Sequence, residues 1–256
     1  MRPNPTLKRD CAKARSPLAP RWGFKLIVLL EKRENMNKKI FVGLAALSIS
    51  LAHADATSSA DTYRQKGYSV SSIAPIFSQL LATSFPPNFK TIFENTKGQQ
   101  YIREAVLEGE DEKKWTQMIT VTGYKDLVSN PNITPRKFVD NMAGGFKRAC
   151  PSSFNASIFS EEKINGFDSF MAVLSCGTSP TTAGKTSESA IILAIKGEKD
   201  YYTIQWAERM EPSSSPIAID KAKWVERFKK LSPIKLCPIL PGEAAPYVSC
   251  VGPNKS

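Results

Sequence analysis

The stretch that decides the fold reads Ser189-Ala-Ile-Ile-Leu-Ala-Ile-Lys196, then Gly197-Glu-Lys-Asp200, then Tyr201-Tyr-Thr-Ile-Gln-Trp-Ala207. The two outer segments are rich in β-branched and aromatic residues, which suit a β-strand. The short polar segment between them begins with Gly and is typical of a tight turn. The stretch therefore predicts two neighbouring strands joined by a hairpin turn.

Further strands are predicted on the N-terminal side of this hairpin. Phe170, Ala172, Leu174 and Cys176 alternate on one face of a strand from Phe167 to Cys176. Other apolar runs are bounded by turn-forming residues. They predict strands at Gln79 to Phe85, Lys90 to Glu94, Tyr101 to Glu108, Trp115 to Tyr124 and Phe154 to Phe159, the first four forming a meander.

Two helices are predicted as well. Thr134 can cap the first helix with Pro135 at its first position, and the stripe Phe138, Met142 and Phe146 has helical spacing. The second helix is capped by Asp220 or Ser215, ends at Pro233 and has an apolar face of Trp224, Val225, Phe228 and Leu231. We therefore expect an α+β fold with an antiparallel or mixed β-sheet covered by two main helices.

An export signal is predicted to begin at Met36. Met36-Asn-Lys-Lys39 is a basic start, Ile40 to Ala52 is an apolar run, and Ala52-His-Ala54 before Asp55 matches the Ala-x-Ala cleavage pattern. The run is shorter than the roughly 18 to 20 residues that cross a bilayer as a helix, so we expect no stable membrane insertion after cleavage. We expect translation to start at Met36, with an authentic basic tail over residues 1–35 as the alternative.

These features predict the organisation of the chain. Residues 1–35 are a leader outside the translated protein, 36–54 are the signal peptide, and 55–72 are a flexible lead-in. Residues 73–232 form a single α+β domain, and 233–256 form a C-terminal tail constrained by a disulfide.

Charge and histidine content exclude several functions once the signal peptide is removed. Of the 35 Lys and Arg, eleven precede Asp55, as do three of the 24 Asp and Glu, which leaves a net charge of +3 (24 against 21) instead of +11. This charge does not favour binding to a nucleic-acid backbone. The one histidine, His53, also precedes the cleavage position, which excludes histidine-dependent nucleophilic catalysis and histidine-ligated zinc.

The cysteines predict two disulfides. Cys11 falls in the leader, which leaves Cys150, Cys176, Cys237 and Cys250 in an oxidising compartment. Of the three pairings that four cysteines allow, Cys150 with Cys176 and Cys237 with Cys250 are favoured, because each pair is close in sequence. A metal site or catalytic dithiol would require a Cys-x-x-Cys spacing that these cysteines lack.

Several motifs resemble functional sites, but each fits a structural role better. Ser179-Pro-Thr-Thr-Ala-Gly-Lys-Thr186 resembles a P-loop, but Ser179 replaces the first Gly and a strand follows where a helix is needed. The acidic run Glu108 to Glu112 lacks the spacing of a calcium loop and fits a solvated turn. Trp115, Tyr124, Tyr201, Tyr202 and Trp206 fit sheet packing. We predict no catalytic, cofactor-binding or metal-binding residues and no cofactor.

Three segments resemble exported proteins of proteobacteria over roughly Leu80 to Leu231. They are Lys114-Trp-Thr-Gln-Met-Ile-Thr-Val121, Thr134-Pro-Arg-Lys-Phe138 and Trp224-Val-Glu-Arg-Phe228. The order of elements is also similar to the PsbP-like α/β/α sandwich superfamily. This resemblance implies a sandwich fold and an accessory or assembly role, and it supplies no catalytic motif.

The favoured function is a non-enzymatic periplasmic binding or accessory protein that acts on an envelope protein or complex. Two alternatives stay open. One is a periplasmic hydrolase that uses carboxylates or a Ser-Lys dyad in place of histidine. The other is a secreted effector or inhibitor, which would be found in the medium instead of the periplasm.

Overall fold

The protein contains two antiparallel β-sheets and three α-helices within residues 70–251, which are the residues that this computed structural model describes. The larger sheet has eight strands in the order β3-β4-β5-β10-β9-β8-β6, with β7 paired to β8, and the smaller has the order β1-β2-β11. The strands are β1 Val70–Ile76, β2 Gln79–Phe85, β3 Phe89–Lys97, β4 Gln100–Leu107, β5 Gln117–Tyr124, β6 Phe154–Ser160, β7 Lys163–Ile164, β8 Phe167–Cys176, β9 Ser187–Lys196, β10 Tyr201–Met210 and β11 Lys235–Pro238. The helices are α2 Pro135–Ala149, α3 Lys221–Leu231 and α4 Val248–Val251, with short 3-10 turns η1 Leu127–Ser129 and η2 Pro180–Thr182.

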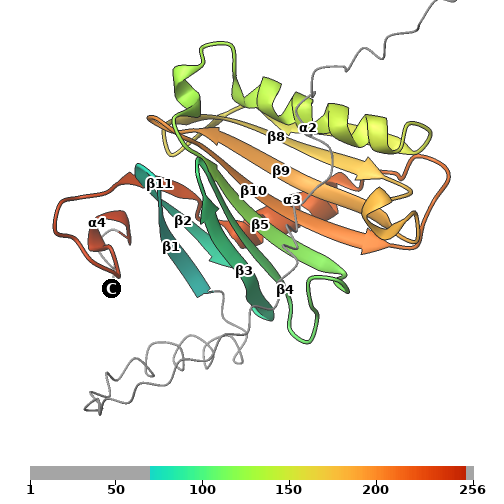
Figure 1. Ribbon diagram of the computed structural model, residues 1–256, viewed down its shortest axis with the longest axis horizontal. Helices are drawn as coiled ribbons and strands as arrows, with labels where there is room; N and C mark the ends of the chain where they lie inside the picture. Colours follow the sequence, from blue (N-terminus) through green and yellow to red (C-terminus); the bar gives the residue numbers. More distant parts are fainter. Residues whose placement is uncertain (1–69, 252–256) are drawn as a thin grey trace, which may run out of the picture.

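The predicted hairpin lies in the middle of the large sheet (Figure 1). β9 pairs with β10 along its whole length, from Lys196 opposite Tyr201 to Ser187 opposite Met210. β8 continues the sheet beyond β9, and β5 continues it beyond β10. The prediction of an α+β fold with a mainly antiparallel sheet is therefore confirmed, and every pair of strands among the described residues is antiparallel.

Asp200 closes the hairpin turn and links the two sheets. Its carboxylate accepts hydrogen bonds from the backbone N (2.9 Å) and Oγ (2.5 Å) of Ser78, in the turn between β1 and β2, and from the backbone N of Asp126 (2.7 Å). Asp200 is 1% exposed. The hydrogen bonds of a buried carboxylate with several donors compensate for the loss of water. Asp200 therefore fixes the β1–β2 turn of the small sheet to the end of the hairpin in the large sheet.

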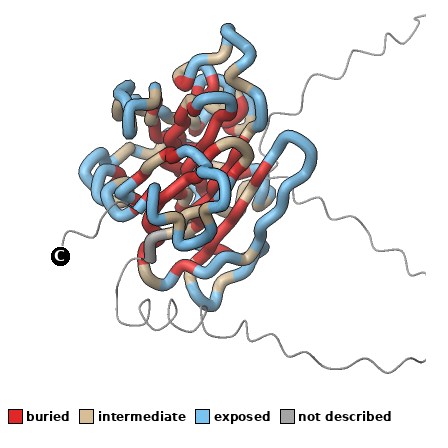
Figure 2. Tube along the Cα trace, turned by 90° about the vertical axis from the view of Figure 1, so that its left-hand side faces the viewer, coloured by how far each residue is buried: buried red, intermediate tan, exposed pale blue. Residues whose placement is uncertain are grey.

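The large sheet separates two apolar clusters, because alternate residues of each strand point to opposite faces. Buried residues run through the middle of the strands, and exposed residues lie mostly in the loops (Figure 2). On one face, Phe138 and Val139 of α2 pack on the β8 residues Phe170, Ala172 and Leu174. The other face packs against the small sheet and α3. That cluster includes Ile191, Leu193, Ile195, Ile204 and Trp206 from the large sheet, Leu81 and Phe85 from β2, and Trp224 and Leu231 from α3.

α2 begins and ends as its sequence predicts. The Oγ1 of Thr134 accepts a hydrogen bond from the backbone N of Lys137 (3.2 Å), which satisfies one of the free amides of the first turn. Lys147 and Arg148 lie in the last turn, where cations suit the helix dipole. The helix runs over β8 and β9 (Figure 1), and Cys150 at its end is bonded to Cys176 at the end of β8.

The small sheet differs from the predicted arrangement. Gln79 to Phe85 was predicted to form a meander with the strands that follow it, whereas β2 pairs with β1 and β11 in a separate sheet. Every residue of β2 is buried, because one side faces the large sheet and the other is covered by the C-terminal segment. β1 begins at Val70, inside the range 55–72 that was expected to be a flexible lead-in, and β11 lies inside the predicted tail.

Asp220 caps the start of α3, which settles the choice between the two predicted caps. The Oδ1 of Asp220 accepts a hydrogen bond from the backbone N of Lys223 (3.1 Å). The buried Glu208 of β10 forms ion pairs with Lys223 (2.5 Å) and Arg227 (2.7 Å) of this helix. α3 is therefore fixed to the large sheet by charge as well as by its apolar face.

Candidate functional site

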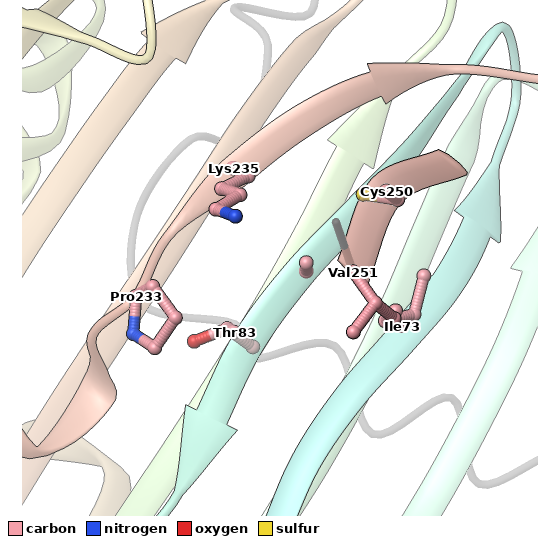
Figure 3. A pocket seen from close by; sticks show the side chains of 7 residues that line it. Ile73, Thr83, Pro233, Lys235, Cys250 and Val251 are labelled. Atoms are coloured by element: carbon pink, nitrogen blue, oxygen red, sulfur yellow. The ribbon is translucent and has the colours of Figure 1, made fainter. Parts of the chain in front are cut away.

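A small hollow lies on the outer face of the small sheet, between that sheet and α4 (Figure 3). Its volume is about 80 Å³. We call it the α4 pocket. It is lined by Ile73, Ala82, Thr83, Pro233, Lys235, Cys250 and Val251.

The floor of the α4 pocket is one row of residues across the three strands. Ala82 of β2 lies opposite both Ile73 of β1 and Lys235 of β11 in the antiparallel register. Directly opposite residues share a face of a sheet, so all three side chains start from the same surface. Ala82 is the shortest of them, and its small side chain leaves the space that the pocket occupies.

The roof of the pocket is held by a disulfide. Cys237 of β11 is bonded to Cys250 of α4, with their Cα atoms 5.6 Å apart. Cys237 pairs with Leu80, the next residue of β2 that points to the same face as Ala82. The bridge therefore holds α4 against this face of the small sheet, where Cys250 and Val251 both line the pocket (Figure 3).

The chemistry of the α4 pocket is that of a small apolar site with one cation. Ile73, Ala82, Pro233 and Val251 supply carbon walls. The ammonium group of Lys235 points toward the hollow in Figure 3. The hydroxyl of Thr83 donates to the backbone O of Leu231 (2.8 Å) and is already engaged. Lys235 is the one titratable side chain of this lining, because Cys250 is in a disulfide. The α4 pocket therefore offers apolar contact and one ammonium group.

A second polar feature, which we call the Glu104 row, runs across three neighbouring strands of the large sheet, β4, β5 and β10. Glu104 of β4 lies opposite Thr120 of β5, which lies opposite Gln205 of β10. Glu104 is 4% exposed, and its Oε1 has no hydrogen-bond partner among the described residues. Burial, together with the nearby Glu112 carboxylate, raises the pKa of Glu104 to about 7. Glu104 is buried and does not line the α4 pocket, so we regard the Glu104 row as part of the interior of the fold.

The P-loop-like segment forms a compact hydroxyl-rich turn. Thr186 is followed directly by β9 and not by a helix, as the sequence indicated. The Oγ of Ser179 donates to the Oε2 of Glu188 (3.2 Å), which is paired with Arg209 (3.2 Å) over the ring of Trp115. Burial raises the pKa of Glu188, and the Arg209 guanidinium opposes that rise. The hydroxyls of Ser179 and Thr181 therefore donate to the carboxylate of an internal ion pair.

The acidic run between β4 and β5 is an ordered turn. The Oδ1 of Asp111 accepts from the backbone N of Lys113 and of Lys114, both at 2.8 Å. These two hydrogen bonds lower the pKa of Asp111. Throughout residues 70–251, no three His, Cys, Asp or Glu side chains gather as ligands of a metal ion would.

The other residues singled out in the sequence are placed as follows. Tyr201, Tyr202, Trp206 and Trp115 are buried in the two faces of the large sheet, which confirms that they pack. Cys150 and Cys176 lie with their Cα atoms 5.7 Å apart and are bonded, as are Cys237 and Cys250. Ala52, Ala54 and Asp55 at the predicted cleavage position lie outside the described residues. No helix between residues 70 and 251 has the length and apolar character that a transmembrane span requires.

Comparison with known proteins yields only distant similarities. No protein-family model and no curated protein matches the chain. Among solved structures, the Ran-binding protein Mog1p of Saccharomyces cerevisiae is 10% identical over 62% of this chain and 84% of its own, with a TM-score of 0.36. LpqN of Mycobacterium tuberculosis, described as involved in cell envelope biogenesis, is 9% identical over 69% of this chain and 95% of its own, with a TM-score of 0.35. Similarities of this size carry no argument about function.

Sequence reasoning did not find the α4 pocket. Ile73, Ala82 and Lys235 are ordinary residues with no motif around them, and they meet only because β11 pairs with β2. The one available signal was the predicted bridge between Cys237 and Cys250. It indicated that the tail is constrained, but not which surface it covers.

Proposed function

We propose that the protein is a non-enzymatic binding protein of the bacterial periplasm, accessory to another protein of the cell envelope, and that the α4 pocket holds part of that partner. The observation that carries this proposal is the apolar hollow with the single ammonium group of Lys235 beside it. Apolar walls with few, placed polar groups are typical of binding sites.

The proposed compartment rests on the sequence. The export signal from Met36 and the Ala-x-Ala pattern before Asp55 support secretion across the inner membrane. Two disulfides support an oxidising compartment, because such bonds persist there and are rare in the cytosol. The resemblance to the PsbP-like superfamily, whose members commonly act as accessory or assembly factors, remains part of the same proposal.

Site-specific photocross-linking in cells tests the proposed function. A photoreactive amino acid replaces Val248, which is on α4 and 65% exposed. The matched control replaces Lys147, an exposed residue of α2. We expect one reproducible adduct with an envelope protein from position 248 and none from position 147.

A pocket-filling variant makes this test specific. Ala82→Leu places a larger side chain in the hollow, and an unchanged melting temperature would show that the fold is kept. The adduct from position 248 should then disappear. Equal adducts from both positions, an adduct that survives Ala82→Leu, or protein found only in the cytoplasm would each overturn the proposed function.

A further inference from the structure

The size of the α4 pocket limits what can enter it. A cavity of about 150 Å³ lined by apolar side chains holds a benzene molecule. The α4 pocket, at about 80 Å³, is roughly half as large. It therefore has room for a branched aliphatic group with three or four carbons and excludes an aromatic ring. Complete burial of such a group is worth about 1.5 to 3 kcal/mol.

The charge beside the pocket indicates what the aliphatic group is attached to. The side-chain ammonium of Lys235 has no ion pair or hydrogen bond among the described residues. Glu243, an acidic residue of the segment that leads to α4, accepts hydrogen bonds from the backbone N (2.8 Å) and Oγ (2.6 Å) of Ser249 instead. An anion on the ligand would be the complementary partner for the Lys235 ammonium.

One residue type carries both groups on a single carbon. In a C-terminal Val, Ile or Leu, the α-carboxylate and the branched side chain are both attached to Cα. An internal aliphatic residue has no charge on its backbone. In an extended chain an adjacent acidic residue points to the opposite side, and one two positions away is on the same side but starts about 7 Å further along the chain. A chain terminus is therefore the peptide group that fits the apolar walls and Lys235 together.

We infer that the α4 pocket recognises the C-terminal aliphatic residue of a partner polypeptide, whose side chain enters the hollow while its carboxylate pairs with Lys235. This inference rests on the proposed function and specifies the partner.

Titration calorimetry with short peptides tests the inference. The probe is acetyl-Gly-Gly-Gly-Val with a free carboxylate, and the matched control is the same peptide with a C-terminal amide. We expect the free acid to bind at least tenfold more tightly than the amide. Lys235→Gln should remove this difference, whereas Lys230→Gln, which changes an exposed lysine of α3, should retain it. Ala82→Leu should abolish binding of both peptides while the protein stays folded.

Three results would overturn the inference. The first is equal binding of acid and amide, or no binding of either. The second is binding of 3-methylbutanoate as tightly as the peptide, because the site would then belong to a small free acid. The third is peptide binding only after residues 252–256 are deleted, because the chain's own end would then be the occupant. If the cross-link from position 248 persists while the peptides fail, the proposed function stands and only this specificity falls.

Discussion

Replacing Glu104 by Gln should change how the stability of the protein depends on pH. The side chain is 4% exposed, its Oε1 lacks a hydrogen-bond partner among the described residues, and its pKa is raised from 4.5 to about 7. A raised pKa means that the folded protein favours the protonated carboxyl. The stabilising contribution of Glu104 is therefore fully present below pH 4.5 and is lost as the pH rises through about 7.

The size of this effect follows from the two pKa values. One pKa unit corresponds to about 1.4 kcal/mol, so a rise from 4.5 to about 7 corresponds to about 3 kcal/mol. Gln has a similar shape and cannot ionise. The wild type should therefore lose about 3 kcal/mol of unfolding free energy relative to Glu104→Gln as the pH rises from about 4 to about 8.

Urea denaturation across this pH range measures the difference. The wild type and Glu104→Gln are unfolded in parallel, with Glu211→Gln as the control because Glu211 is exposed. The control should follow the wild-type profile. Parallel profiles for the wild type and Glu104→Gln from about pH 4 to about pH 8 would refute the reasoning, because they would mean that the carboxyl finds compensation when ionised.

Three further substitutions test contacts that hold the fold, each by urea or thermal unfolding at neutral pH. Asp200→Asn should cost about 1.5 to 3 kcal/mol, because an amide cannot replace the carboxylate that accepts hydrogen bonds between the two sheets; an unchanged midpoint would contradict this. Glu208→Gln should cost about 3 to 5 kcal/mol, because it leaves the mostly buried Arg227 without its counter-charge, and a smaller loss than that of an exposed pair would count against it. Gly177→Ala should cost about 1 to 3 kcal/mol, since an added Cβ would lie 2.1 Å from the backbone O of Ser213; wild-type stability would show that the backbone yields easily.

The local elements of the fold could be predicted because their signals lie within short stretches of chain. Thr134 and Pro135 fix the start of α2, and the alternation from Phe170 to Cys176 fixes β8. The hairpin is visible because its two strands are adjacent and share one turn. In each case the residues that form the pattern lie within or next to the element that they predict, so local propensity and packing favour the same structure.

The small sheet and the α4 pocket could not be predicted, for physical reasons. β2 is buried on both sides, and its apolar residues do not alternate with the polar Gln79, Thr83 and Ser84, so its sequence does not indicate which sheet it joins. β11 is a short strand after a proline and pairs with residues far away in the sequence. The pocket depends on Ala82 facing Lys235, and on Cys250 holding α4 beside them. Only the pairing of distant segments creates that site.

The separation of the two apolar clusters by the large sheet has a consequence for how this protein can change. The face under α2 and the face under the small sheet use alternate residues of the same strands, and none of the residues that form one cluster belongs to the other. Substitutions on the outer side of the small sheet lie a further layer away from α2. Substitutions in the lining of the α4 pocket should therefore leave the packing of α2 on the hairpin unchanged, so the pocket and the face under α2 can change independently.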